Sequence, residues 1–380
     1  MLELLRPAIE RTETDDGFVL SSRTALPEPP RCVGVWLAHW AEERPDATFL
    51  AERDASGGWR RVDYRRAALA VAAIGAGLLA RGATPTRPVM LLSDNGIDAA
   101  LLILACMHVG VPVAPVSPAY SLQSSSFSRL RTLAEVLGPG LVFADDRERY
   151  AAAIAAIGPD VDVLGPLAEL AATPPSAALA RAHAAVGPDT IAKILFTSGS
   201  TGTPKGVVNT QRMLTSNQES LAACWPFLAA RPPVVVDWLP WSHTFGGNHN
   251  FFLVLRNGGS LYIDRGRPAP GLIDVTLANL ADVSPTLWFN VPRGFDQALP
   301  ALERDPELAR RVFARLDLVF YAAAALNATT RARLERVAAA AGRADVFFTS
   351  AWGSTETAPL ATSAHFVTET TGNLGVPVPG

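Results

Sequence analysis

The stretch IAKILFTSGSTGTPKGVVN, residues 191–209, places an apolar run directly before a segment rich in glycine and hydroxyl side chains. Residues 196–209 contain three glycines, two serines, three threonines and one lysine. Glycines let a backbone approach an anion closely, and the exposed N–H groups of such a loop carry partial positive charge. The hydroxyl groups and the ammonium group of Lys205 add further donors. The stretch therefore predicts a strand followed by a loop that binds an anion such as phosphate.

The spacing of this loop differs from the Walker A pattern, in which a Ser or Thr follows the lysine and holds Mg²⁺. Lys205 lies instead between Pro204 and Gly206, so a metal ligand must come from another part of the chain. A flexible polar linker has a similar composition. The position directly after a predicted central strand favours a ligand site, because the carboxyl ends of parallel strands open into a crevice.

Short apolar runs alternate with helix-length segments along most of the chain, as in a parallel sheet covered by helices. The predicted strands are residues 88–93, 140–145, 191–198, 234–239, 260–264, 286–291, 316–322 and 345–351. Most are apolar throughout, which is typical of strands buried on both faces. Residues 64–82 form a predicted helix ended by Gly82, and residues 327–343 one that begins at Asn327 and ends at Gly342. The pattern predicts an α/β fold with mostly parallel sheets flanked by helices.

The composition is that of an ordinary soluble globular protein, with 49% apolar residues, 18% charged residues and a net charge of −3. It has no basic surplus that would indicate nucleic acid as a partner. Three scattered cysteines fit neither a disulfide framework nor a zinc site. The acidic N-terminus lacks the features of a signal peptide, so we expect a cytoplasmic location.

The most apolar segment, residues 97–116, contains Asp98, His108, Pro112 and Pro115. A membrane span of ~20 apolar residues tolerates such side chains poorly. We therefore expect a buried helix followed by a buried strand, and no membrane partner.

Three stretches resemble signatures of the acyl-adenylate-forming enzymes, a family that includes acyl-CoA synthetases, luciferases and the adenylation domains of peptide synthetases. FTSGSTGTPKGV (196–207) resembles the phosphate loop, LPWSHTFGG (239–247) the second signature, and SAWGSTET (350–357) the Y-G-x-T-E signature with Trp352 in the tyrosine place. They follow one another in the family's order. The resemblance implies the family's large domain of two stacked αβ subdomains, a small-molecule carboxylic acid and ATP as substrates, Mg²⁺, and CoA as co-substrate.

The resemblance also implies roles toward the nucleotide. Lys205 would hold the departing pyrophosphate, Thr355 would offer its hydroxyl to the α-phosphate, and Glu356 would bind Mg²⁺. The residues assigned to the nucleotide are Thr197, Ser198, Gly199, Ser200, Thr201, Gly202, Thr203, Lys205, Ala323, Ala324, Ala325, Trp352, Gly353 and Thr355. A flat ring such as that of Trp352 can stack on adenine, while a place in the core is the ordinary alternative.

Residues 320–326, FYAAAAL, fall where the family carries Gly-Gly-Ala-Pro beside adenine. Ala322 and Ala323 replace the glycines, which narrows the approach of the backbone to the base. This departure leaves the detailed contacts with adenine open.

On the acid side, the resemblance places His243 beside the carboxylate, which with Lys205 and Thr355 completes the predicted catalytic set. A single loop histidine is otherwise more often structural. The residues assigned to the acid are Trp241, Ser242, His243, Gly246, Asn248, Ser350 and Ala351. Residues 237–252 and 120–145 resemble the version found in feruloyl-CoA synthases, which implies ferulate or another hydroxycinnamate.

A planar hydroxycinnamate needs a flat apolar slot with a polar end. The candidate walls are Trp238, Trp241, Phe245 and Phe251. The candidates for the polar end are Asn248, His249 and Asn250. The same aromatic residues are equally suited to a core, and other aryl or medium-chain acids remain open.

The predicted domain organisation is an N-terminal αβ subdomain, 1–185, and a second αβ subdomain, 186–380, that carries the nucleotide-binding loops. NLGVPVPG (373–380) resembles a family stretch that precedes a hinge, so we expect the smaller C-terminal domain with its second lysine to be missing from this chain. Two rival functions stay open: an adenylation enzyme that loads a carrier protein, and a non-catalytic remnant that binds nucleotide.

Overall fold

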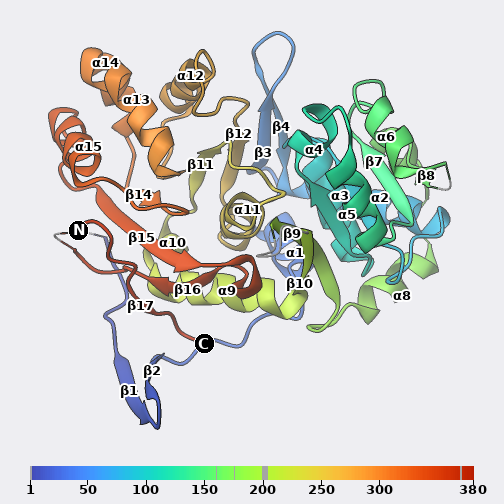
Figure 1. Cartoon of the computed structure of the whole chain (residues 1–380), viewed down its shortest axis with the longest axis horizontal. Coiled ribbons are helices and arrows are strands. Elements are labelled where there is room, and N and C mark those ends of the chain that lie inside the picture. The colour runs from blue at the N-terminus through green and yellow to red at the C-terminus, as the bar shows by residue number, and fades with distance from the viewer. Residues whose placement is uncertain (1, 160, 175, 199–203, 369) are drawn as a thin grey trace.

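The computed structural model describes residues 2–159, 161–174, 176–198, 204–368 and 370–380 (Figure 1). One sheet has the strand order β10-β9-β6-β5-β7-β8. Its strands are β5 (Val89–Leu92), β6 (Val113–Val116), β7 (Leu141–Ala144), β8 (Asp162–Val163), β9 (Ile191–Ser198) and β10 (Pro204–Thr210). Neighbouring strands are parallel except β10, which forms the edge and runs antiparallel to β9.

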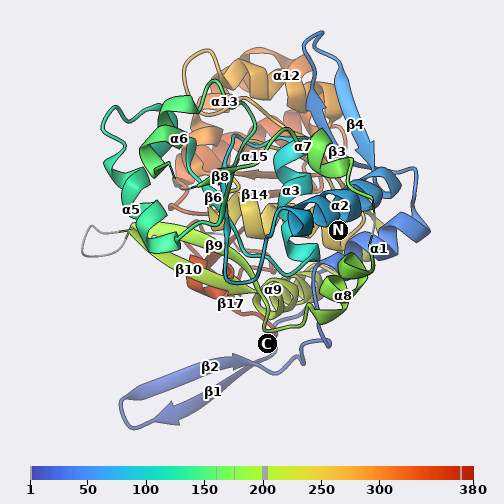
Figure 2. The same cartoon turned by 90° about the vertical axis from the view of Figure 1, so that its right-hand side faces the viewer.

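The larger sheet has the order β17-β16-β15-β14-β13-β11-β12-β3-β4. Its strands are β3 (Thr48–Arg53), β4 (Trp59–Asp63), β11 (Val234–Asp237), β12 (Ser260–Ile263), β13 (Leu287–Asn290), β14 (Leu318–Tyr321), β15 (Phe347–Gly353), β16 (Leu360–Ser363) and β17 (Val376–Pro377). The six neighbours β15, β14, β13, β11, β12 and β3 are parallel to one another. At the two ends of the sheet, β4, β16 and β17 add antiparallel pairs. A separate hairpin of β1 (Ile9–Thr14) and β2 (Gly17–Ser22) projects from the body (Figure 2).

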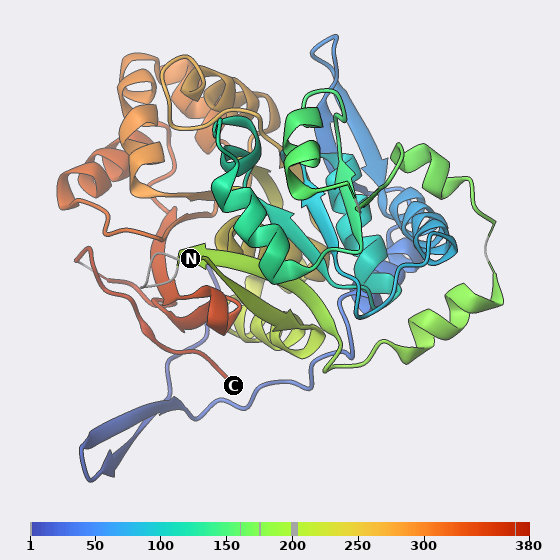
Figure 3. The same ribbon diagram turned by 45° about the vertical axis from the view of Figure 1, so that its right-hand side comes forward.

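Helices cover both sheets. Those before β9 are α1 (Gly34–Glu43), α2 (Tyr64–Ala80), α3 (Ile97–His108), α4 (Pro118–Leu122), α5 (Ser128–Leu137), α6 (Ala151–Ile157), α7 (Leu167–Ala171) and α8 (Ala177–Ala185). Those after β10 are α9 (Gln211–Cys224), α10 (Phe227–Ala230), the π-helix η1 (Phe245–Asn250), α11 (Phe251–Arg256), α12 (Ile273–Val283), α13 (Pro292–Arg304), α14 (Pro306–Phe313), α15 (Ala328–Ala340) and the 3₁₀ turn η2 (Thr355–Thr357). Figure 3 shows the orange C-terminal helices on one side of the molecule and the blue and green helices on the other.

Alternate residues of the buried strands enter different cores, which explains why the strands are apolar throughout. In β13, Leu287 and Phe289 lie in the central core, whereas Trp288 packs with α12–α15. In β5, Leu91 lies in the central core and Met90 packs with α5 and α6. A strand covered on both faces has no solvent side on which polar residues would alternate.

The α/β fold with mostly parallel sheets is confirmed, and each predicted strand overlaps an observed one. Residues 97–116 form α3 and then β6, as expected. The Asn327 side chain accepts a hydrogen bond from the Thr329 amide at the start of α15, and Gly342 has a φ of 82° just after its end. Such a left-handed residue is the usual end of a helix.

Other expectations were wrong. β9 is next to the edge of its sheet rather than central, and the glycine-rich stretch continues into the edge strand β10. Pro204 lacks an N–H and begins β10, a position where proline is tolerated.

Strands from both sides of the predicted domain division share each sheet. β9 and β10, which follow residue 185, complete the smaller sheet, and β3 and β4, which precede it, extend the larger one. The two units at 1–185 and 186–380 stay a prediction. No helix in the described ranges is long and apolar enough to cross a membrane.

Candidate functional site

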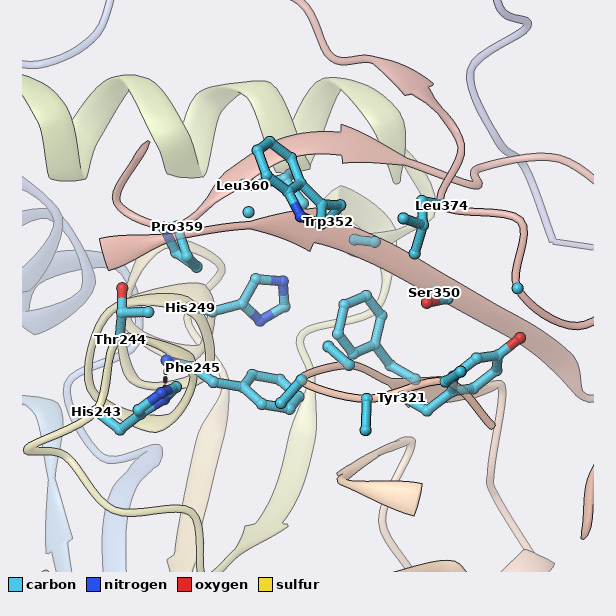
Figure 4. Close-up of a pocket in the computed structure, with 18 residues that line it drawn as sticks. His243, Thr244, Phe245, His249, Tyr321, Ser350, Trp352, Pro359, Leu360 and Leu374 are labelled. Atoms are coloured by element: carbon cyan, nitrogen blue, oxygen red, sulfur yellow. Dashed lines mark hydrogen bonds between the residues drawn. The ribbon is translucent and has the colours of Figure 1, made fainter. Parts of the chain in front are cut away.

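A cavity of about 420 Å³ opens where β14 and β15 end, beside the turn that leads into η1 (Figure 4). Its walls come from four segments far apart in the sequence. The lining residues are His243, Thr244, Phe245, His249, Phe320, Tyr321, Ala322, Ala323, Ala324, Ala325, Ser350, Ala351, Trp352, Gly353, Pro359, Leu360, Gly372 and Leu374. β14 and β15 are parallel neighbours, so this is the crevice at the carboxyl ends of strands where ligands of α/β sheets bind.

The predicted phosphate-binding segment lies on β9 and β10. Thr197 pairs with Lys205 in the antiparallel register, and the Lys205 side chain is exposed. Gly199, Ser200, Thr201, Gly202 and Thr203 lie outside the described residues, and only the backbone of Ser198 is described.

Asn209, which is fully buried on β10, connects the strand that carries Lys205 to η2 and η1. Its amide nitrogen donates to the carbonyl oxygen of Thr355 at 3.1 Å. Its carboxamide oxygen accepts a hydrogen bond from Asn248 of η1 at 2.9 Å. The side chain of Asn209, to which the sequence alone assigned no role, thus links the residues that closely follow the first two signature stretches to Thr355 in the third.

Thr355 and Glu356 lie in η2, the short turn that follows β15. The Ser354 amide donates to the Thr357 hydroxyl at 2.9 Å in this turn, and Asn217 of α9 donates to the carbonyl oxygens of Thr357 and Leu360 at 3.0 and 2.9 Å. Thr355 is buried, whereas Glu356 is exposed. A fixed turn therefore presents the exposed carboxylate of Glu356 next to the strand that carries Lys205.

The wall formed by residues 322–325 and 352–353 corresponds to the predicted adenine site. The Trp352 side chain is 52% exposed, so it is not a core residue and its ring is free to stack on a ligand. Ala323 has a φ of 71°, a left-handed conformation that suits glycine better than alanine. A Cβ atom on Gly353 would collide with the Pro359 carbonyl, so the backbones here are in close contact.

His243 lines the cavity with an exposed side chain, although the surrounding protein lowers the pKa of its imidazole. The Phe245 amide donates to its Nδ1 at 3.3 Å. Because Nδ1 accepts this bond, the proton of the neutral ring is on Nε2. A donor of this kind suits a carboxylate oxygen.

Ser350 and Ala351, the other predicted acid residues that reach the cavity, line it from β15. Trp241, Ser242, Gly246 and Asn248 were predicted to bind the acid, but they are not among its lining residues.

Packing accounts for several of these positions. The ring of Trp241 packs edge-on against Phe251 in the core, and Asn248 is taken up by Asn209. A Cβ atom on Gly246 would collide with the Leu239 carbonyl, so this glycine lets the wide π-helical turn pack on the preceding strand end.

His249 also lines the cavity. It was not among the residues assigned to the acid, and the sequence named it only as one of three candidates for the polar end of the acid pocket. Its side chain is 1% exposed, and burial lowers the pKa of the imidazole to about 4. Its Nδ1 is 2.9 Å from the amide oxygen of Asn250, whose nitrogen donates to Asp237 at 2.8 Å. Burial raises the pKa of Asp237 to about 7.

Lys193 of β9 is another buried ionisable group near η1. It is fully buried, and its Nζ donates to the Gly247 carbonyl at 2.8 Å. Burial lowers the pKa of its ammonium group to about 7. The side chain braces η1 from the strand that leads to the phosphate-binding segment.

Comparison with known proteins gives one family. The model of the family described as "AMP-binding enzyme" matches residues 37–380. A 3-[(3aS,4S,7aS)-7a-methyl-1,5-dioxo-octahydro-1H-inden-4-yl]propanoyl:CoA ligase from Mycobacterium tuberculosis is 31% identical over 241 residues, which are 61% of this chain and 46% of that protein. Long-chain-fatty-acid–CoA ligase FadD15 from Mycobacterium bovis is 26% identical over 292 residues, covering 72% of this chain and 46% of that ligase. The chain thus spans about half the length of these two ligases.

Two solved structures share the fold. The structure of McyG A-PCP complexed with phenylalanyl-adenylate has a TM-score of 0.76 and 18% identity, covering 94% of this chain and 56% of that one. VinN in complex with L-aspartate has a TM-score of 0.74 and 21% identity, covering 92% of this chain and 84% of that one.

Proposed function

Since the chain belongs to the AMP-binding enzyme family, we propose that it is the part of an acid–thiol ligase that binds ATP and a carboxylic acid and forms an acyl-AMP. A carboxylate oxygen attacks the α-phosphorus, the bond between the α- and β-phosphates breaks, and pyrophosphate leaves. The sulfur of CoA then takes the acyl group and AMP is released. The proposed acid is ferulate or another hydroxycinnamate.

The observation that carries this proposal is the link through Asn209 between the strand of Lys205, the turn of Thr355 and the π-helix at the acid end. Adenylation requires that the triphosphate be screened and that the acid and the α-phosphate be held in line. A shared rigid frame for the two binding regions meets the second requirement.

Lys205, together with Mg²⁺ held by Glu356, would screen the triphosphate. Mg²⁺ is usually held by one or two carboxylates together with substrate phosphates and water. No cluster of three or more His, Cys, Asp or Glu side chains exists within the described ranges, and the exposed carboxylate of Glu356 fits the mode in which ATP supplies the other ligands. The Nε2–H of His243 would hold the acid's carboxylate, and the exposed ring of Trp352 would stack on adenine.

The hydroxycinnamate assignment is supported by the aromatic walls of the cavity. Phe245 and Phe320 lie with their ring centroids 5.6 Å apart in its lining. Flat rings of this kind suit a planar aryl acid. An enzyme that loads a carrier protein would use the same first step, so mass spectrometry of the product with CoA and with a carrier protein separates these two functions.

Calorimetry with ATP and Mg²⁺ tests the nucleotide site. We expect binding by the wild-type chain and a loss of roughly 10- to 100-fold in affinity for Lys205→Ala and for Glu356→Ala, as for removal of a charge-assisted contact. Glu307→Ala is the matched control, because Glu307 is an exposed carboxylate at the start of α14. Equal affinities in all four proteins would refute the assignment.

A further inference from the structure

His249 presents a polar atom to an apolar enclosure at the acid end of the cavity. Its ring stacks on Phe320 at a centroid distance of 5.0 Å and meets the edges of Phe289, Phe245 and Trp225 at 5.5, 5.8 and 6.3 Å. Nε2 is buried and has no hydrogen-bond partner among the residues that the structure describes. Figure 4 shows the ring in the middle of the cavity lining.

A buried polar atom without a partner is costly, roughly 1–3 kcal/mol. The unpaired indole N–H of Trp225 does not relieve this cost, because no hydrogen bond joins the two rings and Trp225 is not part of the cavity lining. Because His249 lines the cavity, a ligand that enters there is the candidate partner for this nitrogen.

A chain of hydrogen bonds determines whether this nitrogen donates or accepts. The Leu239 amide donates to one oxygen of Asp237 at 3.0 Å, and the Asn250 nitrogen donates to the other at 2.8 Å. With its nitrogen facing the carboxylate, Asn250 turns its oxygen toward Nδ1 of His249. This oxygen can only accept, so Nδ1 carries the proton of the neutral ring and Nε2 carries a lone pair.

We propose that His249 is the specificity-determining residue of the acid site, and that its Nε2 accepts a hydrogen bond from a donor at the far end of the acid, such as a phenolic hydroxyl group. Asp237 and Asn250 are positioning residues that hold the accepting tautomer. This inference rests on the proposed function and adds to that function the chemistry of the acid's far end. An acid with a methoxy or carbonyl group at that place would bring a second acceptor against the lone pair.

The test uses three sulfamoyl-adenosine analogues of acyl-AMP, which carry 4-hydroxycinnamoyl, 4-methoxycinnamoyl or unsubstituted cinnamoyl groups. Their binding to the chain is measured by calorimetry at pH 8, where Asp237 is ionised. We expect the hydroxy analogue to bind about tenfold or more tightly than the methoxy analogue, since a buried group left unpaired discriminates strongly. His249→Phe should lose this preference and still bind the unsubstituted analogue.

Asp237→Asn provides a sharper variant, because it should reverse the tautomer of His249 and so remove the preference for the hydroxy analogue. The Leu239 amide keeps the oxygen of the new side chain, so its nitrogen faces Asn250 and turns that amide around. Nδ1 of His249 then accepts and Nε2 becomes a donor, to which a hydroxyl oxygen and a methoxy oxygen are both acceptors, so the preference for the hydroxy analogue should be lost.

Nitrogen-15 NMR of the wild type is the measurement that does not depend on a variant folding. We expect the Nε2 signal in the range of an unprotonated imidazole nitrogen at pH 8. A protonated Nε2, or a hydroxyl preference that persists in His249→Phe, would overturn the proposal. Failure of all three analogues to bind would instead refute the proposed function.

Discussion

Lys193 offers the most direct test of the electrostatics around η1. Lys193 and Lys205 are the two lysines of the chain, and only Lys193 is buried. Its Nζ contacts the Gly247 carbonyl and lies 5.0 Å from the centre of the Phe252 ring. Burial without a carboxylate partner disfavours the ammonium form, and this lowers the pKa from 10.5 to about 7.

The lowered pKa makes the free energy of unfolding depend on pH. Between pH 7 and 10.5 the unfolded chain binds a proton at this lysine and the folded chain does not, so stability rises with pH in this window. The slope is about 1.4 kcal/mol per pH unit. Because half of the folded chains still carry the proton at pH 7, the gain between pH 7 and pH 9 is about 2 kcal/mol rather than the full slope over two units.

Urea unfolding followed by tryptophan fluorescence at pH 6, 7, 8 and 9 measures this gain. We expect the wild type to gain about 2 kcal/mol relative to Lys193→Met between pH 7 and 9, and little between pH 6 and 7. Lys205→Met is the matched control, since it removes the same group from an exposed position. Parallel pH profiles for wild type and Lys193→Met would refute the reasoning.

Three further predictions concern the site. Asn209→Leu removes the hydrogen bonds from Asn209 to Thr355 and Asn248. It should lower the free energy of unfolding by roughly 2–4 kcal/mol and weaken ATP binding. An unchanged urea midpoint and an unchanged ATP affinity would contradict this role. Ala323→Gly should raise the free energy of unfolding by about 1 kcal/mol, because glycine adopts a φ of 71° without a steric penalty; a lower urea midpoint would count against it. The preference for a hydroxyl group should decline below pH 7 as Asp237 gains a proton and can donate to Asn250. The charge of Asp264 also raises the pKa of Asp237. If calorimetry shows the same preference from pH 8 to pH 5.5, protonation of Asp237 does not control the preference for the hydroxyl group.

The fold followed from the sequence because strands buried on two faces have a simple pattern. Residues 286–291 and 316–322 are apolar throughout, and both became central strands of the larger sheet. Residues 204–210 were missed as a strand, since Pro204, Lys205 and Gly206 have low strand propensity and the segment is held by pairing with β9 alone. Tertiary pairing of this kind leaves no local signal.

The site was predictable where a motif fixes the backbone and unpredictable where side-chain direction decides. Ser350 and Ala351 line the cavity because they lie toward the carboxyl end of β15, where the crevice opens. In the π-helix, Phe245 and His249 face the cavity while Asn248 turns back to Asn209. Ordinary helical spacing does not describe a π-helical turn, so the sequence alone could not choose among the polar residues of this segment.

The π-helix η1 is braced from both sheets, and this would connect the proposed acid site to the proposed nucleotide site. Lys193 and Asn209 reach it from the strands that flank the phosphate-binding segment, Gln218 donates to two of its carbonyls from α9, and Asp237 binds Asn250 from β11. Burying a lysine and an aspartate costs stability, and such groups cluster at functional sites. Because Lys193 and Asn209 lie on β9 and β10, which would carry the nucleotide site, a displacement of either strand should also displace the wall that holds His249. The acid and ATP are therefore expected to bind to one mechanically continuous frame rather than to two independent pockets.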